Sequence, residues 1–223
     1  KQKTAYEIYQ CDWSSDVCSS DLMEIIKNLL SMEKQNEIEQ TMLGSFPWYY
    51  NSKATYDMFN DYRTLNTPFF GHMFYLNGKN ESEYYFNQIC IPIMEALERH
   101  QGRRFQNRLW RCKANLYTKD GSYPEDFHHP GHIDNSDENF RGETFLYFVN
   151  DADGDTFMFN EEYDYVHKRY GPEGWNGNFT NQLRITAEKG KSVLFPLTQC
   201  HTSSVPRKGG PRITLNFVFG EYF

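Results

Sequence analysis

Residues 128–135 read HHPGHIDN, and residues 199–219 read QCHTSSVPRKGGPRITLNFVF. The first stretch places His132 and Asp134 two positions apart, and the second contains His201. Residues i and i+2 of a β-strand point to the same face, so His132 and Asp134 can reach one metal ion. Two histidines and one carboxylate hold iron(II) on one face and leave other coordination positions open. The sequence therefore predicts a metal site that His201 completes from a distant strand.

The segments around these residues predict β-structure. GETFLYFVNDADGDTFMF (142–159) is typical of a strand, a turn at residues 150–154 and a returning strand. This pattern places the metal pair at one end of a hairpin. GKSVLFPLTQCH (190–201) is typical of a turn followed by an apolar strand that leads to His201.

The last strand, RITLNFVF, alternates polar and apolar side chains. Arg212, Thr214 and Asn216 fall on one face, and the apolar residues between them are predicted to pack into the core. A guanidinium offers a planar pair of donors that matches a carboxylate, which makes Arg212 a candidate anchor for an acidic ligand. Thr214 lies on the same face and can donate to the same group.

The motifs of this chain, and the order in which they occur, resemble those of iron(II)- and 2-oxoglutarate-dependent oxygenases. They comprise a His-x-Asp pair, a strand ending in Val149-Asn150, a Gly-x-Thr turn, a later His, and an Arg about one strand on. Within this family, its short sequence motifs resemble those of small prolyl-4-hydroxylase-like members, including those common in phage and marine metagenomes. The resemblance extends from about Phe46 to Phe223. The resemblance implies a mainly β (α+β) fold. Its core would be a double-stranded β-helix (jelly-roll or cupin-like), with supporting N-terminal helices.

The resemblance also implies the roles of the site residues. His132, Asp134 and His201 would bind Fe(II), and Arg212 would pair with the distal carboxylate of the co-substrate 2-oxoglutarate. Co-substrate contacts would come from three further residues, Thr214, Asn115 and Tyr117. O2 would be the oxidant, with ascorbate allowed as a reductant. The implied reaction hydroxylates an unidentified substrate, such as a protein side chain, a nucleobase or a small metabolite, and releases succinate and CO2.

Two positions separate this chain from variants of the family. Many hydroxylases of this type carry Tyr immediately before the Leu-Asn or Val-Asn pair, but Phe148 stands there and Tyr147 precedes it. A phenol contact to 2-oxoglutarate is therefore either missing or supplied from elsewhere. Asp134 argues against the halogenase variant, which needs the carboxylate position vacated for halide.

Two other classes of function stay open from the sequence: a non-catalytic jelly-roll binding module and a zinc-dependent hydrolase. A zinc site could use His128, His132 and a carboxylate, but it would leave His201 and Arg212 as coincidence. His128 and His129 lie in a segment punctuated by Pro and Gly, which favours a solvated loop over a substrate contact or proton relay.

Residues 160–184 form a long polar insert in which glycines flank Trp175. Such a stretch either borders the active-site mouth or is a variable surface insert. We expect substrate selectivity here and in the loop of residues 120–131. His167 is predicted to lie at the surface, and Cys200 is predicted to be a packing residue.

The chain divides into a leader and one predicted domain. Residues 1–22 lack apolar periodicity, and DWSSDVCSSDL within them matches a translated sequencing adapter, so the natural protein is expected to begin near Met23. A single oxygenase domain would then cover residues 23–223, with a helical and aromatic support region at 23–105 and the β-helix core at 106–223.

Helices are predicted within residues 23–43, as a helix or a helix plus loop, and over residues 82–100, where Ser82 is a candidate cap.

Composition restricts the partners. The leader holds two lysines and four acids, so the rest of the chain carries a net charge of −5, against −7 for the whole. Only Cys90, Cys112 and Cys200 remain outside the leader, which favours a reducing compartment, and no apolar run is long enough to span a membrane. A cytoplasmic protein of a bacterial or phage-infected cell is the resulting expectation.

The aromatic content of 17% invites a nucleic-acid interpretation, because exposed aromatics stack on single strands in basic grooves. The negative net charge argues against nucleic acid without excluding it. Arg103, Arg104 and Arg108 are predicted to form a solvated face rather than a small docking patch for anions.

Overall fold

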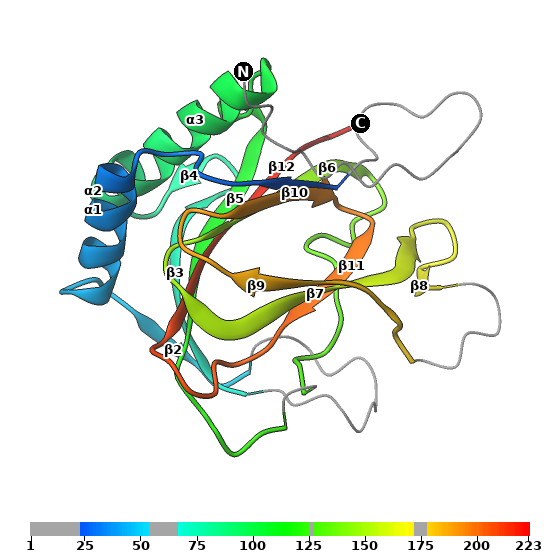
Figure 1. The fold of residues 1–223 in the computed structure, drawn as a ribbon. Helices are drawn as coiled ribbons and strands as arrows, with labels where there is room; N and C mark the ends of the chain where they lie inside the picture. Colours follow the sequence, from blue (N-terminus) through cyan, green and yellow to red (C-terminus); the bar gives the residue numbers. More distant parts are fainter. Residues whose placement is uncertain (1–22, 54–66, 125–126, 172–177) are drawn as a thin grey trace, which may run out of the picture.

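The computed structural model describes residues 23–53, 67–124, 127–171 and 178–223. Two antiparallel β-sheets face each other, and the helices lie against the outer face of the larger sheet (Figure 1). The predictions for residues 1–22 and for Trp175 fall outside the described ranges. Within those ranges, no helix has both the length and the apolar character needed to cross a membrane.

The larger sheet has eight strands in the order β1-β10-β6-β12-β5-β3-β2, and β4 pairs with β3. Its long central strands, β6, β12 and β5, form the wall on which most of the site is built. The strands of this sheet are β1 (Glu24–Ile26), β2 (Tyr49–Asn51), β3 (Phe69–Leu76), β4 (Lys79–Asn80), β5 (Leu109–Tyr117), β6 (Phe140–Phe148), β10 (Ser192–Pro196) and β12 (Arg212–Tyr222).

The smaller sheet has four strands, with β7 in contact with each of the other three. They are β7 (Ala152–Asp164), β8 (Arg169–Tyr170), β9 (Asn181–Ala187) and β11 (Gln199–Ser203). The predicted hairpin over residues 142–159 is wrong, although both of its strands exist. Strand β6 pairs with β10 and β12, whereas β7 pairs with β8, β9 and β11, so the turn between β6 and β7 carries the chain from one sheet to the other.

The helices cover the larger sheet from outside (Figure 1). The N-terminal prediction was right in its helix-plus-loop form: α1 covers Met32–Leu43, and the Ser31 hydroxyl caps it by accepting from the Lys34 amide. The preceding residues instead form β1, which pairs with β10. The second predicted helix exists as three continuous segments, α2 (Glu83–Tyr85), a π-helical turn η1 (Phe86–Cys90) and α3 (Ile91–Gln101), and a short 3-10 turn, η2 (Gln106–Arg108), follows.

The second helical region packs as its spacing predicted. Phe86, Ile89, Ile93 and Leu97 are all buried and belong to the cluster that joins the helices to the large sheet. Pro92 lies in the first turn of α3, directly after the π-helical turn η1, where the regular α-helical hydrogen-bond pattern is already interrupted. Ser82 makes no side-chain cap hydrogen bond, so that part of the prediction was wrong.

Strand β12 separates an apolar layer from a polar one. Ile213, Leu215 and Phe217 are fully buried in the cluster shared with the helices. Their neighbours Arg212, Thr214 and Asn216 point to the opposite face and line a cavity. The polar face predicted from sequence is confirmed, and the jelly-roll arrangement places it toward the smaller sheet.

Candidate functional site

One cavity brings the predicted site residues together. Its wall comes from β5 and β12 of the larger sheet, β7 and β11 of the smaller sheet, and the loop that follows β5. All seven residues singled out from the sequence line it: His132, Asp134, His201, Arg212, Thr214, Asn115 and Tyr117.

Three of them form a metal-ligating group. One ligand atom each from His132, Asp134 and His201 can be chosen so that all lie within 4.8 Å of one another. The Nε2 atom of His201 lies 3.5 Å from Oδ2 of Asp134. Two imidazoles and one carboxylate on one side of a site are the donor set of the two-His-one-carboxylate facial triad, which suits iron(II). Hydrogen bonds within the protein orient each ligand.

The two histidines are fixed by backbone carbonyls. Nδ1 of His132 lies 3.2 Å from the carbonyl oxygen of Pro130, and Nδ1 of His201 lies 3.1 Å from that of Gln199. Each Nδ1 therefore carries the proton and donates it, which leaves Nε2 free as a metal ligand. Burial, reinforced by the nearby His201, lowers the pKa of His132 to about 3, so this imidazole is neutral at physiological pH.

The Asp134 carboxylate is held on both oxygens. Oδ1 accepts from the guanidinium of Arg111 at 2.5 Å, while Oδ2 accepts from Thr144 Oγ1 at 2.8 Å and from Asn216 Nδ2 at 3.0 Å. A carboxylate has about four lone-pair sites, so three donors leave one site for a metal. Burial alone would raise the pKa of Asp134, but the charge of the Arg111 guanidinium outweighs it and holds that pKa well below its usual range. The carboxylate is thus ionised and oriented for binding through one oxygen.

His132 does not lie in a strand, contrary to the prediction. It forms an isolated antiparallel bridge with His201, in which the amide of each donates to the carbonyl of the other at 3.0 and 2.9 Å. This bridge ties the loop to β11, so both histidines share one rigid support. The i, i+2 relation still holds in the extended loop, since His132 and Asp134 belong to the same ligand group.

The insert after β7 supports the metal loop from the side. The Tyr170 hydroxyl lies 3.3 Å from the amide of Ile133 and accepts from it. The ring of Phe179 is so close to Gly131 that an added Cβ would lie 2.7 Å from it, which explains the glycine. The described part of the insert is therefore packed structure beside the site. The surface position of His167 and the packing role of Cys200 are both confirmed.

Arg212 lies at the other end of the cavity and is 1% exposed. It donates to the carbonyl of Gly154 at 3.0 Å and to Thr156 Oγ1 at 2.6 Å, but it forms no ion pair with any described residue. Burial lowers its pKa to about 10, so the guanidinium remains charged. A buried cation without a carboxylate partner is costly for the fold, and it becomes stable when an acidic ligand binds.

The polar residues of β5 face those of β12 in register. Tyr117 lies opposite Arg212, and Asn115 lies opposite Thr214. The Oδ1 atom of Asn115 is buried without a hydrogen-bond partner in the described structure, as expected for a group that meets a ligand. Burial raises the pKa of Tyr117, which keeps its phenol protonated as a donor beside Arg212.

The departure at Phe148 has a structural explanation. Phe148 is fully buried, and its ring centroid lies 5.6 Å from Cζ of Arg212. Tyr147 points the other way, into the core under the helices, where its hydroxyl has no hydrogen-bond partner among the described atoms. The phenol that lines the cavity is that of Tyr117, from a different strand.

The prediction that His128 and His129 lie in a solvated loop was wrong. They are 5% and 2% exposed. His129 lines the cavity, stacks on Tyr117 with ring centroids 4.7 Å apart, and is hydrogen-bonded through Nε2 to Thr67 at 2.7 Å. His128 packs against the aromatic ring of Phe157, away from the ligand group, so the alternative zinc site of His128 and His132 does not assemble in the described structure.

Sequence reasoning missed Lys113 and Arg111. Both lie on β5 at positions that alternate with buried Cys112 and Ala114, in the same series as Asn115. Extending the alternation backward from Asn115 would have placed both side chains on the cavity face.

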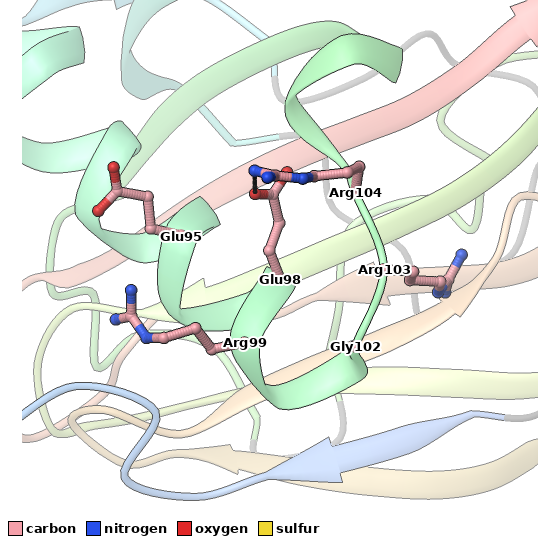
Figure 2. A pocket seen from close by; sticks show the side chains of 6 residues that line it. All are labelled: Glu95, Glu98, Arg99, Gly102, Arg103 and Arg104. Carbon is pink, nitrogen blue, oxygen red and sulfur yellow. Dashed lines mark hydrogen bonds and ion pairs between the residues drawn. The ribbon is translucent and has the colours of Figure 1, made fainter.

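A second concave surface lies where α3 ends, and charged side chains line it together with Gly102 (Figure 2). Glu98 accepts from the amides of Phe105 and Gln106 and pairs with Arg104 at 3.3 Å. Arg103 pairs with Glu143 of β6. Arg103 and Arg104 are exposed, as the predicted solvated face requires, and each is matched by a glutamate, which argues against a docking patch for anions.

Comparison with known proteins supports the fold through structure alone. No family model matches the chain, and no curated protein matches its sequence. Among solved structures, it is similar to a 2OG-Fe(II) oxygenase family oxidoreductase from Burkholderia pseudomallei, with 12% identity, a TM-score of 0.57, and coverage of 88% of this chain and 84% of that one. It is also similar to SnoN, the non-heme alpha-ketoglutarate-dependent epimerase from nogalamycin biosynthesis, with 12% identity, a TM-score of 0.56, and coverage of 91% and 81%.

A third similar structure is a prolyl hydroxylase from Trichoplax adhaerens in complex with a peptide fragment of the hypoxia-inducible factor oxygen degradation domain. The identity is 16%, the TM-score is 0.54, and the match covers 88% of this chain and 83% of that chain. At these identities the similarity establishes the fold. The predicted mainly β, jelly-roll architecture with supporting helices is confirmed.

Proposed function

We propose that this chain is an iron(II)- and 2-oxoglutarate-dependent oxygenase that hydroxylates its substrate and releases succinate and CO2. The observation that carries the proposal is the combination of two features in one cavity. A preoriented group of His132, Asp134 and His201 stands at one end, and the buried Arg212 without an ion pair stands at the other. A binding module without turnover has no use for both.

The residues present fit both implied groups. Two imidazoles and one carboxylate are a ligand set that suits iron(II). Three donors already bind the Asp134 carboxylate, which leaves one of its acceptor sites for the metal. The distal carboxylate of 2-oxoglutarate suits the Arg212 fork, with Thr214 and Tyr117 as further donors and Asn115 at its side. Iron and 2-oxoglutarate together would supply the oxidising chemistry, with O2 as the oxidant and ascorbate allowed as a reductant.

The protein itself would orient the metal ligands and the co-substrate and exclude water from the cavity. The carbonyls behind His132 and His201 fix the tautomer in which Nε2 faces the metal position. Leu146 lines the cavity near these ligands and limits the access of water. Arg212 would hold the far carboxylate of the co-substrate, which would leave the keto acid end to the side of the cavity where His132, Asp134 and His201 lie.

The substrate class is a further part of the proposal. The similar structures include a prolyl hydroxylase in complex with a peptide fragment and the epimerase SnoN in complex with nogalamycin RO. A protein side chain or a small metabolite fits these precedents, and a nucleobase has no support from them. We propose one catalytic domain over residues 23–223, in which residues 23–105 brace the β-helix core of residues 106–223.

The test is turnover of 2-oxoglutarate by the purified chain. We expect succinate formation that requires added Fe(II) and O2, and we expect it to fall to background in His132→Ala, because two remaining ligands cannot hold the metal. His167→Ala is the matched control, since His167 is exposed and pairs with Asp164 far from the ligand group. Turnover by the wild type without iron, or full turnover by His132→Ala, would contradict the proposal.

A further inference from the structure

Lys113 is a second cation in the cavity that has no assigned partner. It lies on β5 and lines the cavity together with Asn115 and the metal-ligating group. No hydrogen bond or ion pair joins it to any described residue. Arg111, two positions earlier on the same strand, is by contrast already paired with Asp134. Lys113 is therefore the cation of β5 that remains available to a ligand.

The strand register places Lys113 at the metal end. It lies opposite Asn216 of β12, and Asn216 donates to the Asp134 carboxylate. Arg212 lies opposite Tyr117, four residues away along each strand, which corresponds to roughly 13 Å. The cavity thus has one unpaired cation at each end, with Asn115 and Thr214 on the rung between them.

Two unpaired cations at the ends of one cavity match a ligand with two carboxylates. Neither cation has an ion pair among the described residues, although Asp134 acts on Lys113 and Asp155 acts on Arg212 from farther away. A dianion with one carboxylate near each cation would compensate both charges directly. A 2-oxo diacid has this form. One carboxylate lies far from its keto group, and the other lies next to it and must sit beside the metal.

We propose that Lys113 binds the carboxylate adjacent to the keto group of the 2-oxo acid, at the metal end of the cavity. This inference rests on the proposed function, and it adds a residue that determines co-substrate specificity. Arg212 selects diacids over monoacids because it needs the far carboxylate. Lys113 contributes to every 2-oxo acid, whatever its far end carries, and it fixes the direction in which the acid lies.

The test compares two probes that share the keto acid end. Fe(II)-loaded full-length protein is titrated without oxygen with 2-oxoglutarate and, separately, with pyruvate, and the visible charge-transfer band gives each dissociation constant. We expect Lys113→Met to weaken both acids about tenfold or more, since a charge-assisted hydrogen bond is lost. Lys113→Arg should keep affinities within a few fold of the wild type. Arg212→Met should weaken 2-oxoglutarate and leave pyruvate unchanged.

Two further measurements separate this role from a structural one. Iron affinity and the melting temperature of Lys113→Met should not fall below those of the wild type, because Lys113 is not a metal ligand, has no hydrogen bond to any described side chain, and is a cation without an ion pair in the cavity; Lys113→Gln serves if the Met variant does not fold. Equal affinity of wild type and Lys113→Met for both acids, or a loss confined to 2-oxoglutarate, overturns the inference alone. A wild type that binds iron but neither acid overturns the proposed function, and the inference with it.

Discussion

Charged residues cluster in two places in this molecule, and the two clusters differ in how their charges are balanced. At the end of α3, Arg104 pairs with Glu98 (Figure 2). Arg103, beside it, pairs with Glu143 of β6. In the cavity between the sheets, Arg212 and Lys113 have no ion-pair partner among the described residues. Both clusters contain guanidinium groups close to the β-sheet. Among the described residues, Arg99 at the end of α3 also has no ion pair, but it is exposed to solvent, whereas the unpaired cations of the cavity lie inside the fold.

The difference indicates what each cluster is for. A charge matched by its neighbours stabilises a local arrangement, such as the turn after α3, and its removal changes folding free energy. A charge left unmatched inside the fold costs stability and is useful only when a ligand matches it. Arg111 differs from both groups: it forms an ion pair, but its partner Asp134 is a candidate metal ligand.

The largest effect is expected for Arg212→Met. Loss of two charge-assisted hydrogen bonds to the distal carboxylate should raise the KM for 2-oxoglutarate at least about 100-fold. The melting temperature without ligand should not fall, because removing an unpaired buried charge offsets the lost bonds to Gly154 and Thr156. Steady-state succinate formation and thermal melting measure the two quantities.

A clear loss of melting temperature in Arg212→Met, with unchanged KM, would break the comparison. Arg212 would then stabilise the fold in the same way as the paired arginines at the end of α3. Arg103→Met is the matched control: its partner Glu143 is buried, so this variant should lose stability and keep the KM of the wild type.

Arg111→Met should have the next largest effect, on metal affinity. Arg111 holds one oxygen of Asp134, and residues behind a metal ligand typically contribute 10- to 100-fold to affinity, so we expect a loss of about tenfold or more in Fe(II) or Mn(II) binding. The measurement is a metal titration without oxygen. Unchanged affinity would mean that Thr144 and Asn216 alone orient the carboxylate.

The site residues could be predicted from the sequence more completely than the pairing of the strands. Alternation on β12 assigned Arg212 and Thr214 to one face, and the i, i+2 spacing joined His132 to Asp134, because both patterns are local. The partner of each strand is a long-range property. Nothing within residues 142–159 distinguishes a hairpin from two strands that enter different sheets, and this is why that prediction failed.

The same limit explains the error at His129. Polar residues between Pro and Gly are usually solvated, so the local pattern favoured a surface loop. In the structure, Tyr117 from β5 and Thr67 from before β3 cover His129, and neither position is close to it in sequence. Ionic pairing is equally long-range: Arg103 and Glu143 are 40 residues apart, so their match could not be predicted from composition.

The smallest effect is expected for Glu98→Ala, and it should appear in stability alone. Two backbone amides, of Phe105 and Gln106, lose their acceptor, which costs about 1–3 kcal/mol of unfolding free energy. Succinate formation per folded molecule should stay unchanged, because Glu98 lies on α3, outside the cavity. Denaturant unfolding and turnover are measured on the same preparation, and lower activity at equal folded fraction would show that the two clusters are coupled.

The pH dependence of this variant sharpens the comparison further. Burial would raise the pKa of Glu98, but hydrogen bonds from the amides of Gln106 and Phe105, with Arg104, lower it overall. A carboxyl whose pKa is lower in the folded state stabilises the fold above its unfolded pKa of about 4.3, and that contribution disappears as the pH falls through the folded pKa. The stability difference between wild type and Glu98→Ala should therefore be constant near neutral pH and shrink in acid. A difference that grows in acid would mean that Glu98 stabilises the turn as a neutral group, and the end of α3 would then no longer be a cluster of matched charges.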